Sequence, residues 1–288
     1  FQNAGLSIFV IGFVIFNLTL AEVNGRKLYT DYSKFFILQK IFFVLISLGL
    51  FQFIGPEGIL IGYGLSYIPF FKRMYISLRT NNFNFKFLKE KSGFIANNYS
   101  LDMVSAVGGQ IDKLMIVPLF GFGLLGNYYL GLQVVSMLGI IPGVIFTYIL
   151  PQDASGSSTK KLRMLTILGS VILAVLGVFL APILILIVFP EYEESLTLIP
   201  ILSISIIPGT ITAMYTSKFL GKEKSLYILI GYLISASALV LGILILSEIF
   251  GVIGLAIAYV GSMSLQAIFL VIMNYFKRDI FREKMNHE

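Results

Sequence analysis

The chain has 288 residues, of which 57% are hydrophobic and only 12% are charged, and its formal net charge is +6. A soluble globular domain is about 45–50% apolar and about 25% charged, so this composition excludes a water-soluble enzyme, because no fold of this size buries so much apolar surface away from lipid. The chain has no cysteine and a single histidine, His287, which excludes a disulfide framework and argues against histidine or thiolate metal sites.

Nine hydrophobic segments are long enough to cross a bilayer as helices, which takes about 20 apolar residues. In chain order they are residues 4–21, 35–53, 58–78, 94–119, 126–150, 162–189, 195–220, 225–246 and 252–276. The breaks between them are short and carry turn residues, as at Gly121-Phe122-Gly123, and the longest polar stretch is only Arg79–Gly93. The sequence therefore predicts an all-α integral membrane protein with nine transmembrane helices and no soluble domain.

Basic residues gather on one side of these segments. All but two of the 21 lysines and arginines lie in odd-numbered loops or the C-terminal tail, whereas the even-numbered loops carry glutamates. By the positive-inside rule, the odd-numbered loops and the C-terminus are cytoplasmic, and the protein is a multi-pass protein of the cell membrane. The positive charge then reflects topology, and we expect the lipid bilayer, not nucleic acid, as the partner of this charge.

An internal repeat suggests how the segments are grouped. Gly55–Ser66 matches Gly251–Ser262 at both leading glycines, at a tyrosine and at the final serine. Transporters are commonly built from repeated helix bundles. If each unit has six helices, residues 1–79 are the last three helices of an N-terminal lobe, 80–93 a cytoplasmic linker, 94–276 a complete C-terminal lobe and 277–288 a basic cytoplasmic tail. We therefore expect a fragment of a twelve-span protein that lacks its first three helices.

The fourth segment carries a polar stripe. Its members, spaced by 4, 3, 4 and 3 residues, are Asn98, Asp102, Ser105, Gly109 and Asp112. This spacing places them on one helix face, and a charge at the bilayer centre costs about 2.5–3.5 kcal/mol. Two interpretations stay open: Asp102 and Asp112 bind a coupling ion (Na⁺ or H⁺) or gate a water-filled cavity in which Lys113 is a cation, or the stripe is a structural seam between helices. We favour the cavity, because two carboxylates exceed what packing needs.

Other polar residues inside the segments are weaker candidates. Lys72 and Arg73 either bind an anionic head group or anchor the third helix. Gln133 and Gln266 are expected to form hydrogen bonds between helices, with contact to a cavity as the second interpretation. Tyr128–Tyr129 is expected at the outer interface, in an aromatic belt.

Catalytic signatures are absent from the sequence. It contains no P-loop, no HExxH, no GxSxG and no paired acids in a soluble loop. We therefore predict no catalytic residue, no metal ligand, no cofactor apart from the coupling ion, and no enzyme activity.

One stretch resembles a known family. Gly108–Val135, GGQIDKLMIVPLFGFGLLGNYYLGLQVV, combines an Ile-Asp-Lys start with a later hydrophobic-G-x-x-x-x-G-x-Y pattern. It resembles the first helix of the second lobe in polysaccharide and O-antigen flippases of the multidrug/oligosaccharidyl-lipid/polysaccharide (MOP) exporter superfamily. Pro190–Ser203, the Gly221-Lys222 turn and Gly251–Tyr259 are similar to further family positions, so the resemblance extends from about Gly55 to Phe276.

This resemblance implies a two-lobe, MATE-like architecture around a cationic cavity that opens alternately to each face. The implied activity is the flipping of a polyprenyl-(pyro)phosphate-linked oligosaccharide to the outer leaflet for surface polysaccharide assembly, with that lipid-linked oligosaccharide as substrate and glycan-assembly enzymes as further candidate partners. Asp112 and Lys113 match the family's second-lobe motif. The acid that related flippases place near the fifth helix of this lobe, for sodium, has no counterpart in residues 225–246, which offer only Ser235 and Ser237.

Three alternatives stay open. An ion-coupled multidrug or metabolite exporter of the same superfamily would have the same architecture. A membrane glycan polymerase would be an enzyme, and it would normally carry acids or arginines on a larger outside loop. The last alternative is an inactive fragment.

Overall fold

The computed structural model describes residues 2–80, 85–192 and 194–285, and these residues form helices and turns without a strand, as predicted. The helices are α1 (Gln2–Gly25), α2 (Tyr29–Ile54), α3 (Glu57–Leu65), α4 (Ile68–Thr80), α5 (Phe85–Glu90), α6 (Ser92–Leu138), α7 (Ile140–Ala154), α8 (Lys160–Val188), α9 (Ser195–Ile204), α10 (Ile206–Leu220), α11 (Ser225–Phe250) and α12 (Val252–Met285). Parts of the predicted N-terminal lobe, linker, acidic loops and tail (Phe1, residues 81–84, Glu193 and residues 286–288) lie outside the described residues.

Seven of the described helical stretches are long and apolar enough to cross a membrane: α1, α2, α6, α8, α9 with α10, α11 and α12. Their outer faces carry large exposed apolar side chains; on α8, for example, Ile172, Phe179 and Ile187 are 65–72% exposed. Such faces are stable only where lipid solvates them. The chain is therefore a multi-pass helical membrane protein.

The chain divides into two compact units, residues 1–89 and 90–288. We call them the N-terminal unit and the C-terminal unit. The division falls inside the stretch expected as a linker, and each unit is described by itself below.

In the N-terminal unit, α2 and α3 form an antiparallel helical hairpin in close contact. A Cβ atom on Gly58 would lie 2.6 Å from the backbone of Leu50, and one on Gly62 would lie 2.7 Å from Cα of Ser47. A turn at Ser66-Tyr67 separates α3 from α4, and α1 packs across this turn through the buried aromatic residues Phe16, Tyr67 and Phe70. Together α3 and α4 occupy the predicted third segment.

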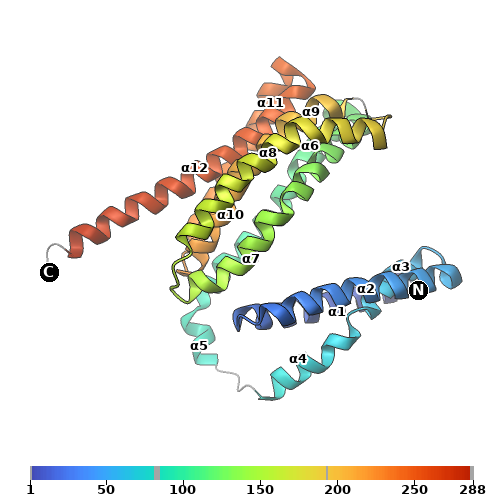
Figure 1. The fold of residues 1–288 in the computed structure, drawn as a ribbon, viewed down its shortest axis with the longest axis vertical. Coiled ribbons are helices and arrows are strands. Elements are labelled where there is room, and N and C mark those ends of the chain that lie inside the picture. Colours follow the sequence, from blue (N-terminus) through green and yellow to red (C-terminus); the bar gives the residue numbers. More distant parts are fainter. Residues whose placement is uncertain (1, 81–84, 193, 286–288) are drawn as a thin grey trace. The chain divides into compact units, whose positions relative to one another are not determined.

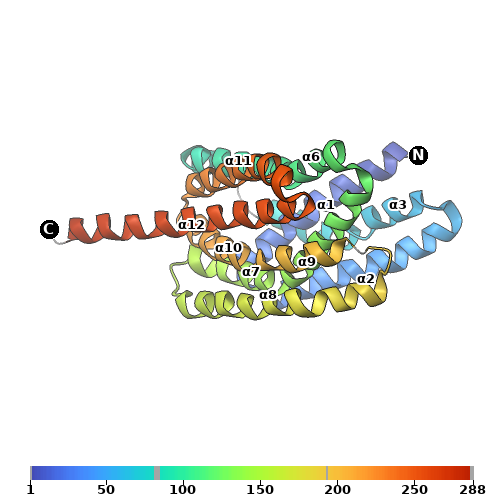
Figure 2. The same ribbon diagram turned by 90° about the horizontal axis from the view of Figure 1, so that it is seen from above.

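In the C-terminal unit, α6 changes direction at Gly121, whose φ of +83° and ψ of 178° are not helical. Only glycine adopts this conformation without strain, and the sequence predicted a break here. We call residues 92–120 the first arm of α6 and residues 122–138 its second arm. The second arm continues through Gly139 into α7, and successive segments then alternate in direction along the unit (Figures 1 and 2).

This alternation gives the C-terminal unit two chemically different ends. At the acidic end, Asn127 of the second arm donates a hydrogen bond to Glu194 before α9, at 3.3 Å. At the basic end, Lys91 pairs with Glu223, and the lysines at the starts of α8 and α11 lie at this end. The acidic end corresponds to the even-numbered loops of the sequence and the basic end to the odd-numbered loops.

Two apolar clusters lie at different depths of the C-terminal unit. One, near the acidic end, contains Ile116, Tyr128 and Leu255. The other, near the basic end, contains Leu101 and Phe219. Between these clusters, α6, α11 and α12 turn mostly small or polar residues toward a common cavity, which is the candidate site.

Candidate functional site

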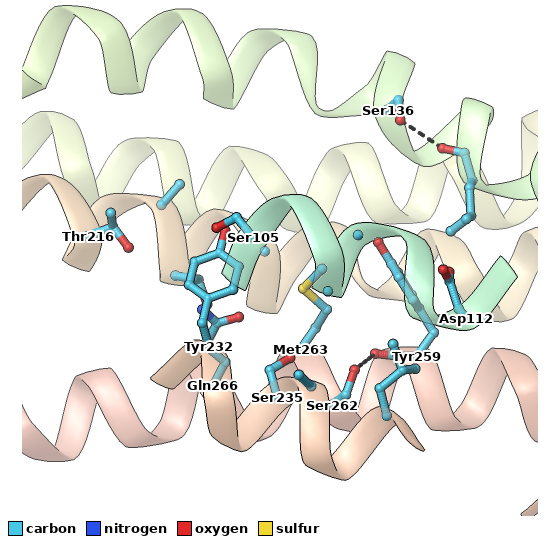
Figure 3. A pocket seen from close by; sticks show the side chains of 18 of the residues that line it. Ser105, Asp112, Ser136, Thr216, Tyr232, Ser235, Tyr259, Ser262, Met263 and Gln266 are labelled. Atoms are coloured by element: carbon cyan, nitrogen blue, oxygen red, sulfur yellow. Dashed lines mark hydrogen bonds between the residues drawn. The ribbon is translucent and has the colours of Figure 1, made fainter. Parts of the chain in front are cut away.

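A cavity of about 610 Å³ lies between the two apolar clusters, lined by both arms of α6 and by α7, α10, α11 and α12. Its polar lining residues are Ser105, Asp112, Lys113, Tyr129, Gln133, Ser136, Thr212, Thr216, Tyr232, Ser235, Tyr259, Ser262 and Gln266. Figure 3 shows Ser105 and Asp112 on the first arm of α6 together with Tyr232, Ser235, Ser262 and Gln266 of the α11–α12 pair. Ligand pockets in proteins measure about 300–1,000 Å³, so this cavity has the size of a binding site.

Glycines keep the cavity open. Gly108, Gly109, Gly143 and Gly209 all line it, and a Cβ atom added to any of them would meet no atom within 4 Å. Elsewhere in this protein glycines permit close helix packing; a Cβ atom on Gly177, for example, would lie 2.6 Å from Leu138 and Ser203 side chains. The lining glycines therefore leave room in the cavity and do not make close helix contacts.

Asp112 is the most constrained polar group of the cavity. It is only 3% exposed; its Oδ2 accepts a hydrogen bond from the hydroxyl of Tyr128 at 3.0 Å, and its Oδ1 accepts one from the backbone N–H of Lys113 at 2.8 Å. Burying a carboxylate is costly unless such bonds compensate for lost water. Because Tyr128 belongs to the second arm, its bond to Asp112 also joins the two arms across the bend at Gly121.

The expectation that Tyr128 lies in an interfacial aromatic belt is wrong. Its side chain is fully buried, because the bend at Gly121 turns the second arm back against the first. Its neighbour Tyr129 is 45% exposed and lines the cavity.

Lys113 supplies the cavity with a positive charge. Its Nζ donates to the backbone oxygen of Gly109 at 3.3 Å and to Oε1 of Gln110 at 3.1 Å, and it lies 5.3 Å from the ring centroid of Tyr129. These partners are all formally neutral, and within the described part of the chain no carboxylate forms an ion pair with Lys113. A charge–ring contact of this kind stabilises an ammonium group without neutralising it.

The predicted polar stripe divides in two. Ser105, Gly109 and Asp112 line the cavity, whereas Asn98 and Asp102 do not. Asn98 donates to the backbone oxygen of Phe94 in its own helix, at 2.9 Å, and Asp102 is exposed. At 1.5 Å per residue, Asp102 lies about 15 Å along the axis from Asp112, toward the basic end and beyond the depth of the cavity.

Both candidate glutamines line the cavity. Gln133 is exposed, whereas Gln266 is 2% exposed and its Nε2 has no hydrogen-bond partner among the described residues. The Oγ1 of Thr212, another lining residue, is likewise buried without a partner there. Unpartnered buried polar atoms carry a desolvation cost, which a ligand with complementary groups would remove.

Lys72 and Arg73 belong to the N-terminal unit and have no part in this cavity. Arg73 lies 3.2 Å from Glu22 and 3.7 Å from Asp31, with its guanidinium 5.2 Å from the ring centroid of Phe35. Its charge is thus balanced within its own unit, which favours the anchoring interpretation for Arg73. Lys72 is exposed and lines a shallow pocket beside it.

Sequence reasoning missed the contribution of α11 and α12. The spacing that could have revealed it is the one that revealed the stripe in α6: Tyr232, Ser235 and Leu239 lie at i, i+3 and i+7, and so do Tyr259, Ser262 and Gln266. Each set therefore occupies one helix face. Serine and tyrosine are ordinary residues in membrane helices, which makes this signal weaker than a pair of carboxylates.

Comparison of the chain with models of known protein families, with curated proteins and with solved structures gave no match.

Proposed function

We propose that this protein is a transporter that flips a polyprenyl-(pyro)phosphate-linked oligosaccharide across the membrane by alternating access. The observation that carries the proposal is Lys113: an ammonium group with only neutral described partners, on the wall of a 610 Å³ cavity inside a membrane-embedded bundle. A charge in such a place is costly and marks a substrate or ion pathway by default. A phosphate group of the substrate would neutralise it.

The proposed topology has nine crossings with the basic end in the cytoplasm. In this count α3 and α4 together form one crossing, and the first arm of α6 forms another. The second arm of α6 and α7 together form the next crossing. The separation of basic and glutamate-bearing loops between the two ends of the C-terminal unit supports this orientation. The substrate would then enter from the cytoplasmic leaflet through the basic end.

The substrate class rests on the cavity together with the motif of Gly108–Val135. The lining combines one cation with hydroxyl and amide groups, including the unpartnered Nε2 of Gln266 and Oγ1 of Thr212. A cation suits a phosphate, and hydroxyl and amide groups suit the hydroxyls of a sugar. The resemblance of Asp112-Lys113 to the second-lobe motif of polysaccharide flippases points to the same class.

Asp112 favours a second candidate, an ion-coupled exporter of small molecules. Among the described lining residues it is the single carboxylate, and its hydrogen bond with Tyr128 would weaken if the carboxylate gained a proton or bound Na⁺. In the flippase, Asp112 would serve as the site of the coupling ion. In the exporter, it would be the main determinant of transport.

The proposed function is tested with the purified chain in liposomes that contain a fluorescent polyprenyl diphosphate glycan, scoring its movement between leaflets with a membrane-impermeant quencher. Lys113→Gln should slow flipping about tenfold to a hundredfold, because a hydrogen bond to a charged group contributes about 1.5–3 kcal/mol. Gly209→Leu should block it by filling the cavity, because a Cβ atom at Gly209 has open space. Gly261→Leu is the matched control, because Gly261 is exposed, has open space for a Cβ atom and does not line the cavity.

Flipping by wild type that is no faster than in empty liposomes would contradict the flippase. Equal rates for Lys113→Gln and wild type would remove the role of the cavity cation. If cationic dyes move down an imposed proton or sodium gradient, the glycan lipid does not move, and Asp112→Asn abolishes dye transport, the exporter is the correct assignment.

A further inference from the structure

A second pocket, of about 580 Å³, lies at the basic end of the C-terminal unit. It is formed by the loop before α8, the first turns of α8, the end of α10 and α12, and it shares no residue with the cavity described above. Nothing in the proposed transport cycle uses it.

Positive charge dominates its described lining, which contains Lys160, Arg163, Lys218 and Lys222 but only one carboxylate, Asp153. That carboxylate already has hydrogen-bond partners within the protein. It accepts two hydrogen bonds from Nη2 of Arg163, at 3.0 and 2.8 Å, and others from Thr159 at 2.5 Å and Ser217 at 2.7 Å. Asp153 and Arg163 therefore neutralise each other, and Lys160 and Lys222 keep the pocket positive. Nζ of Lys218 donates a hydrogen bond to Oδ1 of Asn274 at 2.6 Å.

Local structure adds to this charge. Thr159 occupies the N-cap position of α8, yet its hydroxyl donates to Asp153 and makes no capping bond to the helix. The first backbone N–H groups of a helix have no intrahelical acceptor, and they form the positive end of the helix dipole. The uncapped start of α8, 29 residues long, thus adds a partial positive charge to the wall that Thr159 and Lys160 form. Helix N-termini of this kind bind phosphate groups.

One wall of the pocket is apolar and open to the membrane. Met164 and Leu168, on the second and third turns of α8, line the pocket and are 62% and 53% exposed. Tyr275, which also lines it, is 57% exposed on α12. A soluble anion has no apolar group to bury against this wall, whereas the acyl chains of a phospholipid would cover it.

We propose that this pocket binds the phosphate group of an anionic phospholipid, with the headgroup among Lys160, Lys218 and Lys222 and the acyl chains along Met164 and Leu168. Basic pockets between transmembrane helices are suited to anionic lipid headgroups. The site is distinct from the transport cavity, so its occupancy does not depend on whether the protein is a flippase or an exporter.

The test is native mass spectrometry of the purified chain after incubation with phosphatidylglycerol or with phosphatidylcholine. Wild type should retain one phosphatidylglycerol molecule more tightly than any phosphatidylcholine molecule. The double variant Lys160→Gln, Lys222→Gln should weaken that retention about tenfold. Each of the two lysines attracts the anionic headgroup, and the two contributions are of similar size. Both lysines are exposed and form no ion pair within the described residues, so the variant should fold, which its melting temperature checks.

The matched control is Lys161→Gln with Lys86→Gln, which removes the same charge from exposed lysines outside the pocket. It should bind phosphatidylglycerol within twofold of wild type. Equal weakening in both double variants would overturn the proposal, since general surface charge would then account for binding. Equal retention of the two lipids would also overturn it. Displacement of phosphatidylglycerol by inorganic phosphate alone, without a lipid preference, would reassign the pocket to a soluble anion.

Discussion

Two helical hairpins in this protein have the same type of turn. One is formed by α2 and α3 in the N-terminal unit, and the other by α11 and α12 in the C-terminal unit. Gly55 and Gly251, which are 196 positions apart, both have positive φ, +71° and +57°, and each N–H donates to the carbonyl four residues earlier at 2.9 Å. A Cβ atom on Gly58 would lie 2.6 Å from the backbone oxygen of Leu50, and one on Gly254 would lie 2.0 Å from that of Leu246. Leu50 and Leu246 are also 196 positions apart, so the repeated residues build the same close contact twice.

The repeated serines also have one role. Ser66 Oγ donates to the carbonyl oxygen of Tyr63 at 2.6 Å, and Ser262 Oγ donates to that of Tyr259 at 2.8 Å. In both hairpins the serine hydroxyl therefore satisfies a carbonyl one turn earlier. The repeated glycines, tyrosines and serines thus lie in equivalent local structures.

The interiors of the two hairpins differ. In the N-terminal unit, Nε2 of Gln39 donates to Oγ of Ser66 at 3.0 Å, and both residues are buried. The position 196 residues after Gln39 is Ser235, whose shorter side chain lines the cavity beside Ser262. The hairpin of α2 and α3 is therefore packed at this point, whereas the hairpin of α11 and α12 borders the cavity. The two differ in the length of the side chain at the equivalent positions Gln39 and Ser235.

The largest effect is expected where the shared turn has no spare room. Gly254→Ala would force a methyl group against the Leu246 carbonyl and should lower the free energy of unfolding by about 3 kcal/mol. Gly58→Ala, with a longer contact, should cost about 2 kcal/mol. Melting temperatures in detergent measure both changes, with Gly261→Ala as the control. A Gly254→Ala protein as stable as the control would contradict the equivalence of the two turns.

Filling the hollow hairpin should separate transport from stability. Ser235→Gln copies the side chain of Gln39 into the C-terminal unit, where we expect its amide to bond to Ser262 as Gln39 bonds to Ser66. Transport in liposomes should fall at least about tenfold, which is about 1.4 kcal/mol of barrier, whereas the melting temperature should not fall. Ser237→Gln, on the same helix but outside the cavity lining, is the control, and equal transport by the two variants would contradict a functional cavity.

Emptying the filled hairpin should have a smaller effect, on stability. Gln39→Ala removes the hydrogen bond to Ser66 and should lower the free energy of unfolding by about 1 kcal/mol. Gln52→Ala, at an exposed position of the same helix, should leave it unchanged. A melting temperature for Gln39→Ala equal to that of Gln52→Ala would show that the buried bond does not stabilise the N-terminal unit.

The smallest expected change is in stability at Gln266. Because its Nε2 is buried without a described partner, Gln266→Met should leave the free energy of unfolding within about 1 kcal/mol of wild type, or raise it. Transport should nevertheless decrease, because the amide is then absent from the cavity. A large loss of stability with normal transport would make Gln266 a structural residue.

The all-helical membrane class and the break at Gly121 could be predicted from the sequence, because lipid selects long apolar helices and glycine permits the turn. The site could be predicted only in part. Periodicity assigns Asp102 and Asp112 to one face, but it does not say which of them lies at the depth of the cavity. It also could not reveal that Tyr128 folds back onto Asp112, because this contact depends on the angle of the bend at Gly121.

The central claim is that the C-terminal hairpin borders a water-filled cavity where the N-terminal hairpin is packed. The chain contains no cysteine, so single cysteines can be introduced into an otherwise thiol-free protein. We expect Ser235→Cys and Ser262→Cys to react with a small, charged, membrane-impermeant thiol reagent, and Ser66→Cys to remain unmodified. Failure of both C-terminal cysteines to react, or equal reaction at all three, would contradict the account.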